Sequence, residues 1–183
     1  MAGKDVAPER EDYTVAYLSD WPRFIPEVAQ HCFTEWPSTY EVYGIKDVAG
    51  VEQDYRNHIA KNAHNTKIGV PLICFATRKQ EGGGVERVLC GSCVVEQSDF
   101  HDRHDLTPWV TSVFVVPEFR RKGVARLLMM RALEVAKGLG YPHLWLWTEG
   151  HHGSFELYKK CGFVETETTE YIGMKITIMK HTF

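Results

Sequence analysis

Cationic side chains and a glycine gather in one short segment, between an apolar run that ends at Pro117 and an apolar, helix-like stretch. The segment consists of Arg120, Arg121, Lys122, Gly123, Val124, Ala125 and Arg126. A strand–turn–helix arrangement leaves the first N–H groups of the helix without intrahelical partners, and the helix dipole adds positive charge there. Such a turn binds an anionic phosphate group, and Gly123 lets the backbone approach it closely. The spacing matches neither G-x-x-x-x-G-K-[ST] nor G-x-G-x-x-G, so we expect a phosphate-bearing ligand other than a nucleoside triphosphate.

The charge of this segment also distinguishes a ligand site from a solvated helix end. A helix N-terminus favours anions, and cations placed there oppose the helix dipole. Because four cations cluster at this point, we expect a bound ligand to supply the negative charge.

Two motifs resemble those of a known family. Arg120 to Ala125 (R-R-K-G-V-A) is similar to the [QR]-x-x-G-x-[GA] signature with which the GNAT acetyltransferases hold the pyrophosphate of acetyl-CoA. Ser154 to Phe163 (S-F-E-L-Y-K-K-C-G-F) resembles the A-x-x-L-Y-x-x-x-G-F segment of the same family. The resemblance covers roughly residues 13–180. It implies an α/β fold with a mostly antiparallel sheet of about seven strands, about four flanking helices and splayed central strands.

The resemblance also implies a mechanism. In the family, the central strand donates backbone N–H groups to the thioester and pantetheine, and here that strand contains Val113, Phe114 and Val115. Donors preorganised at a developing oxyanion supply a large share of such catalysis. Tyr158 matches the family's general acid, and a phenol with a pKa of about 10 is close to the pKa of about 8.5 of a thiol.

Cofactor contacts are also implied at the start of the second motif. We assign Ser154 and His151 to them, although His151 stands where many members carry asparagine, seven residues before Tyr158.

The general base that accepts the amine proton is not fixed by either motif. Glu35, at the end of the first expected helix, lies in a region that lines the acceptor pocket in the family, and we name it as the candidate base. The loop of residues 101–105 (H-D-R-H-D) precedes the central strand and is an alternative source. Trp109 and Pro108, which lead into that strand, fit a structural role at least as well as a catalytic one.

Metal sites are not expected. Cys90 and Cys93 have C-x-x-C spacing, but they lie in a strand-like run and no second pair of this spacing exists. Four histidines fall in two loops without the spacing of accompanying thiolates or carboxylates that zinc sites show. They are His101, His104, His151 and His152.

Periodicity and turn residues predict alternating strands and helices. A helix should begin near Pro22 and stop before Pro37, a second should cover Val48 to Ala63, and a third Lys122 to Leu139. A short helix is expected at Ser154 to Lys160. The predicted strands are Tyr13 to Leu18, Val70 to Arg78, Val85 to Glu96, Val110 to Val116, His143 to Thr148, Phe163 to Thr169 and Met174 to Lys180.

Composition limits the classes of function. The 183 residues carry 44% hydrophobic side chains and a formal net charge of −3, which predict one globular domain at 13–183 after a flexible tail at 1–12. The balance of charge argues against a nucleic-acid partner, which requires concentrated positive charge. No apolar run approaches the roughly 20 residues that span a bilayer, and neither a signal peptide nor paired cysteines are evident. We therefore expect no membrane partner and a cytoplasmic location, and a homodimer is compatible with the sequence.

The function expected from the sequence is acetyl transfer from acetyl-CoA to a primary amine of a small molecule. Two alternatives stay open. One is acetylation of protein N-termini or lysines, and the other is a CoA-binding sensor that has lost turnover.

Overall fold

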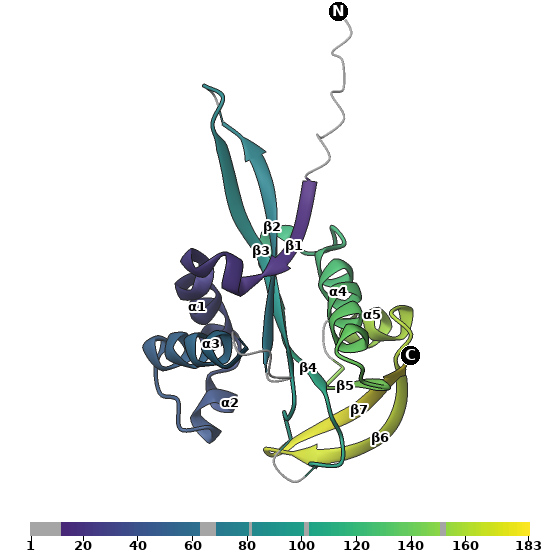
Figure 1. The fold of residues 1–183 in the computed structure, drawn as a ribbon. Helices are drawn as coiled ribbons and strands as arrows, with labels where there is room; N and C mark the ends of the chain where they lie inside the picture. The colour runs from purple at the N-terminus through teal and green to yellow at the C-terminus, as the bar shows by residue number, and fades with distance from the viewer. Residues whose placement is uncertain (1–11, 63–68, 81, 101–102, 151–152) are drawn as a thin grey trace, which may run out of the picture.

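The computed structural model describes residues 12–62, 69–80, 82–100, 103–150 and 153–183. It contains seven strands and five α-helices in these ranges, drawn in Figure 1. The strands are β1 (Asp12–Tyr17), β2 (Val70–Lys79), β3 (Val85–Glu96), β4 (Trp109–Val115), β5 (His143–Thr148), β6 (Val164–Tyr171) and β7 (Met174–Thr182). The helices are α1 (Ile25–Glu35), α2 (Pro37–Val42), α3 (Val48–Asn62), α4 (Val124–Gly138) and α5 (Ser154–Lys160).

All seven strands form one sheet in the order β1-β2-β3-β4-β5-β7-β6. Every neighbouring pair is antiparallel except β4 and β5, which run parallel. The mostly antiparallel, mixed α/β fold of about seven strands expected from the sequence is therefore confirmed. The β2–β3 hairpin and its turn at the glycine-rich segment were also expected, and the hairpin extends well beyond the rest of the sheet in Figure 1.

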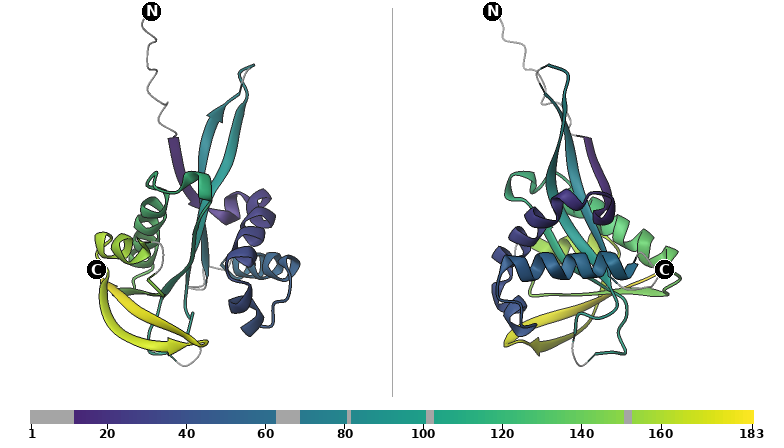
Figure 2. Two further views of the ribbon diagram at one scale, coloured as in Figure 1. Left: turned by 180° about the vertical axis from the view of Figure 1, so that it is seen from behind. Right: turned by 60° about the vertical axis from the view of Figure 1, so that its left-hand side comes forward.

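Helices cover both faces of the sheet, as the three views in Figures 1 and 2 show. α1, α2 and α3 lie on one face, and α4 and α5 lie on the other. The apolar stripes of α1 and α3 bury Val28, Cys32 and Val51 against Ile73 and Val94 of the sheet. On the other face, α4 contributes the most to a second core, in which Leu128 and Met129 are fully buried. The two cores fix the sheet between the two helical layers.

The helices differ from the sequence prediction at three points. Pro37 was interpreted as a stop, but proline is tolerated in the first turn of a helix, and α2 begins at this residue. This adds a helix to the four that were expected. At Pro22 the chain forms a 3₁₀ turn, and α1 begins at Ile25. α4 begins at Val124 instead of Lys122, because the two residues before it belong to the turn.

None of the helices in the described ranges is long and apolar enough to cross a membrane.

Candidate active site

The two central strands part almost at once. β4 and β5 are paired only at Trp109 and Trp145, where the Trp145 N–H donates to the carbonyl of Pro108 over 2.9 Å. Beyond this point β4 continues to Val115 without pairing to β5. The splayed central strands expected from the sequence are confirmed, and they leave a backbone edge of β4 unpaired by its neighbour.

The backbone of β4 is irregular where the strands part. Its register with β3 shifts between Ser92 and Val94, and Ser112 on β4 has a φ of 51°, in the left-handed region that non-glycine residues rarely adopt. A register shift with an extra residue on one strand is a β-bulge, which bends the strand and redirects its groups. Such bulges are frequent beside active sites.

The far end of β4 shows which way its N–H groups point. The Val116 N–H donates to the carbonyl of Cys90 on β3 over 2.9 Å, so by alternation the polar groups of Val115 point away from β3. The carbonyl of Val115 does so, because it accepts a hydrogen bond of 3.0 Å from Nε of Arg120. The N–H of Val115 therefore points into the opening, as a donor to a ligand would. Phe114 is buried and Val113 half-buried beside it.

The cationic turn follows β4 through a 3₁₀ turn at Pro117–Phe119. Arg121 has a φ of 63° and Gly123 a φ of 91°, so two left-handed residues bend the chain sharply before α4. A Cβ on Gly123 would meet no other atom within 4 Å, so it is this φ that favours glycine there. The first intrahelical bond of α4 runs from Leu127 N–H to the carbonyl of Gly123. The N–H groups of Val124, Ala125 and Arg126, in the first turn of α4, have no intrahelical partner and can bind a ligand.

The side chains of this turn divide by exposure. Val124 is buried and anchors the start of α4 in the core, and Ala125 is half-buried. The other members are exposed, namely Arg120, Arg121, Lys122, Gly123 and Arg126. Free N–H groups, exposed cations and a small residue in one turn fit the pyrophosphate of a CoA molecule. The pantetheine and thioester of such a ligand would then reach the opening beside β4.

Tyr158 lies on α5, on the same side of the sheet as α4, where it is buried in the core with Cys93 and Cys161. Its ring packs edge-to-face on Phe163 with centroids 6.3 Å apart. Burial, followed by the nearby Cys93 and Cys161 thiols, raises the pKa of Tyr158 above its ordinary value. The phenol is therefore protonated at neutral pH, which is the state that a proton donor needs.

Of the two residues implied to contact the cofactor beside α5, the structure describes only Ser154. The Ser154 hydroxyl is 3.0 Å from that of Thr148, which also accepts the Gly150 N–H over 3.1 Å. These bonds tie the start of α5 to the end of β5. His151 lies outside the described residues, so its contact and that of Ser154 with a cofactor stay predictions.

Glu35 and the following tryptophan lie at the end of α1, beside β4. Glu35 is exposed at the end of α1, and its role as base stays a prediction. The ring of Trp36 meets Phe114 edge-on at 6.3 Å, and the ring of His31 stacks on Phe114 at 5.0 Å. α1 is therefore packed directly against the irregular strand.

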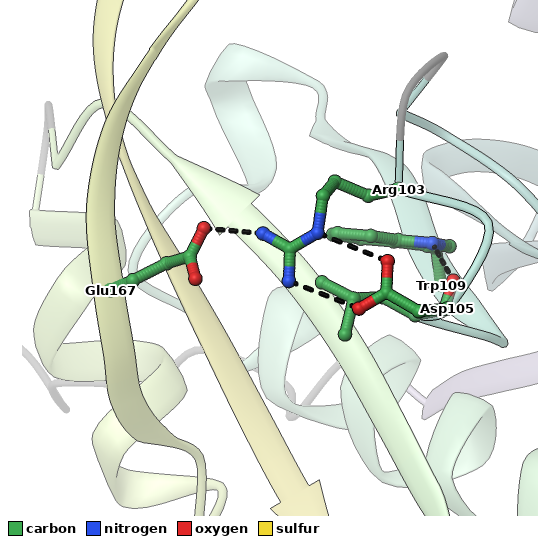
Figure 3. Close-up of polar contacts among 5 residues, drawn as sticks. Arg103, Asp105, Trp109 and Glu167 are labelled. Atoms are coloured by element: carbon green, nitrogen blue, oxygen red, sulfur yellow. Dashed lines mark hydrogen bonds and ion pairs between the residues drawn. The ribbon is translucent and has the colours of Figure 1, made fainter.

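The described part of the loop before β4 is held by polar contacts of Arg103 and Trp109, which Figure 3 shows. Arg103 binds both carboxylate oxygens of Asp105, at 3.1 and 3.2 Å, and also pairs with Glu167 on β6. The Arg103 guanidinium holds the pKa of the Asp105 carboxyl below its usual value. Trp109 is fully buried, and its indole N–H donates to the Leu106 carbonyl over 2.6 Å. The structural interpretation of Trp109 is confirmed, and His101 lies outside the described residues.

One acidic group that sequence reasoning missed lies close to β4. Glu96, the last residue of β3, accepts a hydrogen bond from the Thr111 hydroxyl of β4. His58 of α3 lies 3.9 Å from the other carboxylate oxygen, and its second ring nitrogen lies 3.3 Å from Asp54. The group has no sequence motif because its members come from β3, β4 and α3.

Tyrosines that the sequence analysis did not single out connect elements around the same face. The hydroxyls of Tyr43, at the end of α2, and Tyr171, at the end of β6, lie 3.3 Å apart. Both donate to the carbonyl of Asp99, at 3.4 Å each. These contacts connect the end of α2 to the β6–β7 hairpin.

The structure describes the two cysteines of the C-x-x-C pair and one of the four histidines that were considered as metal ligands. Cys90 and Cys93 are buried in the core against α4, and burial raises the pKa of the Cys93 thiol. Of the four histidines, only His104 is described, and it is exposed. Among the described residues there is no group of three or more His, Cys, Asp or Glu placed to hold a metal ion.

Comparison with known proteins decides the family. The model of the acetyltransferase (GNAT) family matches residues 35–163, which is more than half of the chain. The chain belongs to this family. The match contains β4, the cationic turn, α4 and Tyr158, so the resemblance seen in the two motifs is confirmed.

Individual relatives of this GNAT chain are distant. It is 36% identical over 63 residues to MJ1207, an uncharacterised N-acetyltransferase of Methanocaldococcus jannaschii, a match that covers 33% of this chain and 27% of that relative.

Solved structures share the fold at low identity. The structure of yncA of Salmonella typhimurium with its cofactor acetyl-CoA has a TM-score of 0.62 at 20% identity, and the match covers 93% of this chain and 94% of yncA. The PaiA N-acetyltransferase of Thermoplasma acidophilum, in complex with coenzyme A, has a TM-score of 0.63 at 19% identity, and the match covers 94% of this chain and 99% of that protein. The spermidine N-acetyltransferase of Vibrio cholerae, in complex with CoA and spermine, has a TM-score of 0.61 at 19% identity, and the match covers 93% of this chain and 95% of that protein.

Proposed function

We propose that this GNAT protein transfers the acetyl group of acetyl-CoA to the primary amine of a small molecule. The observation that carries this proposal is the phosphate-binding turn at the start of α4 directly beside the opening between β4 and β5. A turn alone would suit many phosphorylated ligands. A turn next to an unpaired strand edge suits a long ligand with phosphates at one end and a thioester at the other.

Each part of the arrangement has a chemical role in the proposal. The cations and N–H groups of residues 120–126 neutralise the pyrophosphate. The backbone N–H of Val115 orients the ligand along β4, and the irregular backbone at Ser112 to Phe114 places donors near the thioester carbonyl. Tyr158 gives its hydroxyl proton to the departing thiolate.

The acceptor is proposed to be compact. The Tyr43 and Tyr171 hydroxyls lie 3.3 Å apart and connect the end of α2 to the β6–β7 hairpin, and Tyr171 shares a core with Trp109 at the start of β4. This connection would restrict the room for a polypeptide beside the start of β4. The similar fold of the Vibrio cholerae enzyme, whose structure contains spermine, agrees with a small amine as the substrate class. Acetylation of a protein N-terminus or lysine is the less favoured alternative.

Acetyl-CoA is expected to raise the melting temperature of the full chain. A ligand that binds only the folded state stabilises it by RT ln(1 + [L]/Kd), which is about 2.7 kcal/mol at 100 times Kd. Differential scanning fluorimetry across a titration of acetyl-CoA measures the shift. A well-folded sample with no shift at millimolar acetyl-CoA would contradict the proposed ligand.

Reversal of one charge in the turn should weaken binding of the donor. Arg121→Glu is expected to raise KM for acetyl-CoA by about 10- to 100-fold, because one charged hydrogen bond contributes about 1.5–3 kcal/mol. kcat should change little, because the pyrophosphate contact is equal in the ground and transition states. The control is Lys175→Glu, which makes the same change in charge at an exposed position of β7. Equal KM values for the two variants would place the cofactor elsewhere.

A further inference from the structure

Glu96 has a position that no motif explains. It is the last residue of β3, its side chain is 21% exposed, and it accepts a hydrogen bond from the Thr111 hydroxyl. Thr111 directly precedes Ser112, whose φ of 51° marks the irregular part of β4. The carboxylate is therefore held beside the strand segment that leads to the expected thioester site, and it keeps some access to solvent.

We propose that Glu96 is the general base that removes a proton from the substrate ammonium. The inference rests on the acetyl transfer proposed above and names a residue for a role that the family motifs leave open.

The two faces of the sheet support this assignment. The cationic turn and Tyr158 lie on the side of α4 and α5, whereas Glu96 meets His58 of α3 on the opposite side. A donor whose phosphates bind at α4 reaches the opening from one face. An amine that attacks the same carbonyl has the opposite face available, and there Glu96 is the carboxylate bonded to β4.

Charged and titratable groups surround Glu96 on several elements. Burial raises the pKa of Glu96, and the Thr111 hydrogen bond and the His58 charge partly oppose this. The surrounding groups are Asp54, Tyr55 and His58 of α3, Tyr43 after α2, and Asp99 of the loop that follows β3. A raised pKa brings a carboxylate closer to the operating pH, where a general base is most effective.

His58 offers a route by which the proton leaves. Hydrogen bonding to Asp54 raises the pKa of His58, and the other ring nitrogen of His58 lies 3.9 Å from the Glu96 carboxylate. The His58 side chain is 20% exposed and that of Asp54 is 45% exposed. Glu96, His58 and Asp54 therefore form a series of polar groups that begins beside β4 and ends at the solvent.

The protons and bonds of the reaction balance with these groups. Glu96 takes one proton from the ammonium and passes it to solvent on the side of His58. The neutral amine then forms the C–N bond, and the C–S bond breaks. The thiolate takes a proton from Tyr158, and the second proton that leaves the nitrogen restores that phenol. One amide, one CoA thiol and one released proton result.

The test is a comparison of Glu96→Gln with wild type in the full chain. Release of CoA thiol is followed with acetyl-CoA and a panel containing an aliphatic diamine, an arylalkylamine, an α-amino acid and an aminoglycoside. For the amine that wild type acetylates fastest, we expect kcat/KM at pH 7 to fall by about 10²- to 10⁴-fold. The shift in melting temperature with acetyl-CoA should be unchanged. Glu86→Gln, an exposed residue at the other end of β3, is the matched control.

The pH profile separates a base from a structural residue. As pH rises towards the pKa of the amine, about 10.4 for an aliphatic primary amine, a growing fraction of the substrate is already neutral, so the deficit of Glu96→Gln should shrink. In Thr111→Val the donor that lowers the pKa of Glu96 is lost, so the acid limb of kcat/KM should move to higher pH. Because Thr111→Val keeps the carboxylate, it tests the proposal even where Glu96→Gln folds poorly.

Three results would overturn the inference. A Glu96→Gln variant within about threefold of wild type would exclude the role, as would a deficit that is the same at every pH. A large loss in Glu35→Gln without one in Glu96→Gln would assign the base to Glu35. Wild type that binds acetyl-CoA but acetylates no amine of the panel would instead refute the proposed function itself, and the inference with it.

Discussion

Replacement of Tyr158 with phenylalanine is expected to lower kcat by about 10²- to 10⁴-fold, the range that general acid catalysis contributes. The phenol is buried on α5, and its pKa is raised by that burial, so it carries its proton at neutral pH. Phenylalanine keeps the ring that packs on Phe163. The loss should therefore appear in kcat, and the affinity for acetyl-CoA and the melting temperature should stay close to those of wild type.

Steady-state kinetics measure the change in kcat, and pre-steady-state kinetics check that the chemical step limits the rate. Tyr141→Phe, which removes a hydroxyl just after α4, serves as the control for loss of a phenol alone. The alkaline limb attributed to Tyr158 should lie above the pKa of about 10 of an ordinary phenol. A Tyr158→Phe variant within about threefold of wild type, with chemistry rate-limiting, would show that another group or water supplies the proton.

Replacement of Trp109 with alanine is expected to lower the free energy of unfolding by about 3–5 kcal/mol, the usual cost of truncating a buried aromatic residue. Trp109 is fully buried, donates to the Leu106 carbonyl and lies at the single pair that joins β4 to β5. Its loss leaves a cavity and an unpaired carbonyl at the point where the strands begin to part. Because domains are stable by about 5–15 kcal/mol, the effect should be large.

Urea denaturation followed by fluorescence or circular dichroism measures the change in stability. Trp21→Ala provides the comparison, because this tryptophan is only half-buried, against Phe24 and Phe75. The loss should be smaller there. A loss below about 1 kcal/mol for Trp109→Ala would mean that the junction of β4 and β5 is held by other contacts.

The parts of the site that were predicted from the sequence are those whose residues are contiguous. The turn of residues 120–126 and the segment around Tyr158 each carry a local pattern, and the structure places both on the same face of the sheet. The strand order was not predicted, because periodicity does not specify which strands pair. The seven strands and the splayed centre were then confirmed.

The parts that were missed depend either on contacts between distant segments or on local backbone conformations that the residue types leave open. Glu96 reads as an ordinary end to an apolar strand, and only its contact with Thr111 and His58 shows a shared environment. α2 was missed because Pro37 is compatible both with a helix stop and with the first position of a helix. The start of α4 was placed two residues early, because a sequence does not show that Gly123 adopts a φ of 91°.

The most direct test of acetyl transfer is to follow both products in one reaction. The full chain is incubated with acetyl-CoA and the amine panel, and mass spectrometry quantifies the acetylated amine while a thiol reagent quantifies released CoA. Our prediction is that CoA is released at a rate above hydrolysis only when an acceptor amine is present, with one acetylated amine formed for each CoA. Release of CoA without any acetylated amine, or no release from a chain that is shown to bind acetyl-CoA, would contradict it.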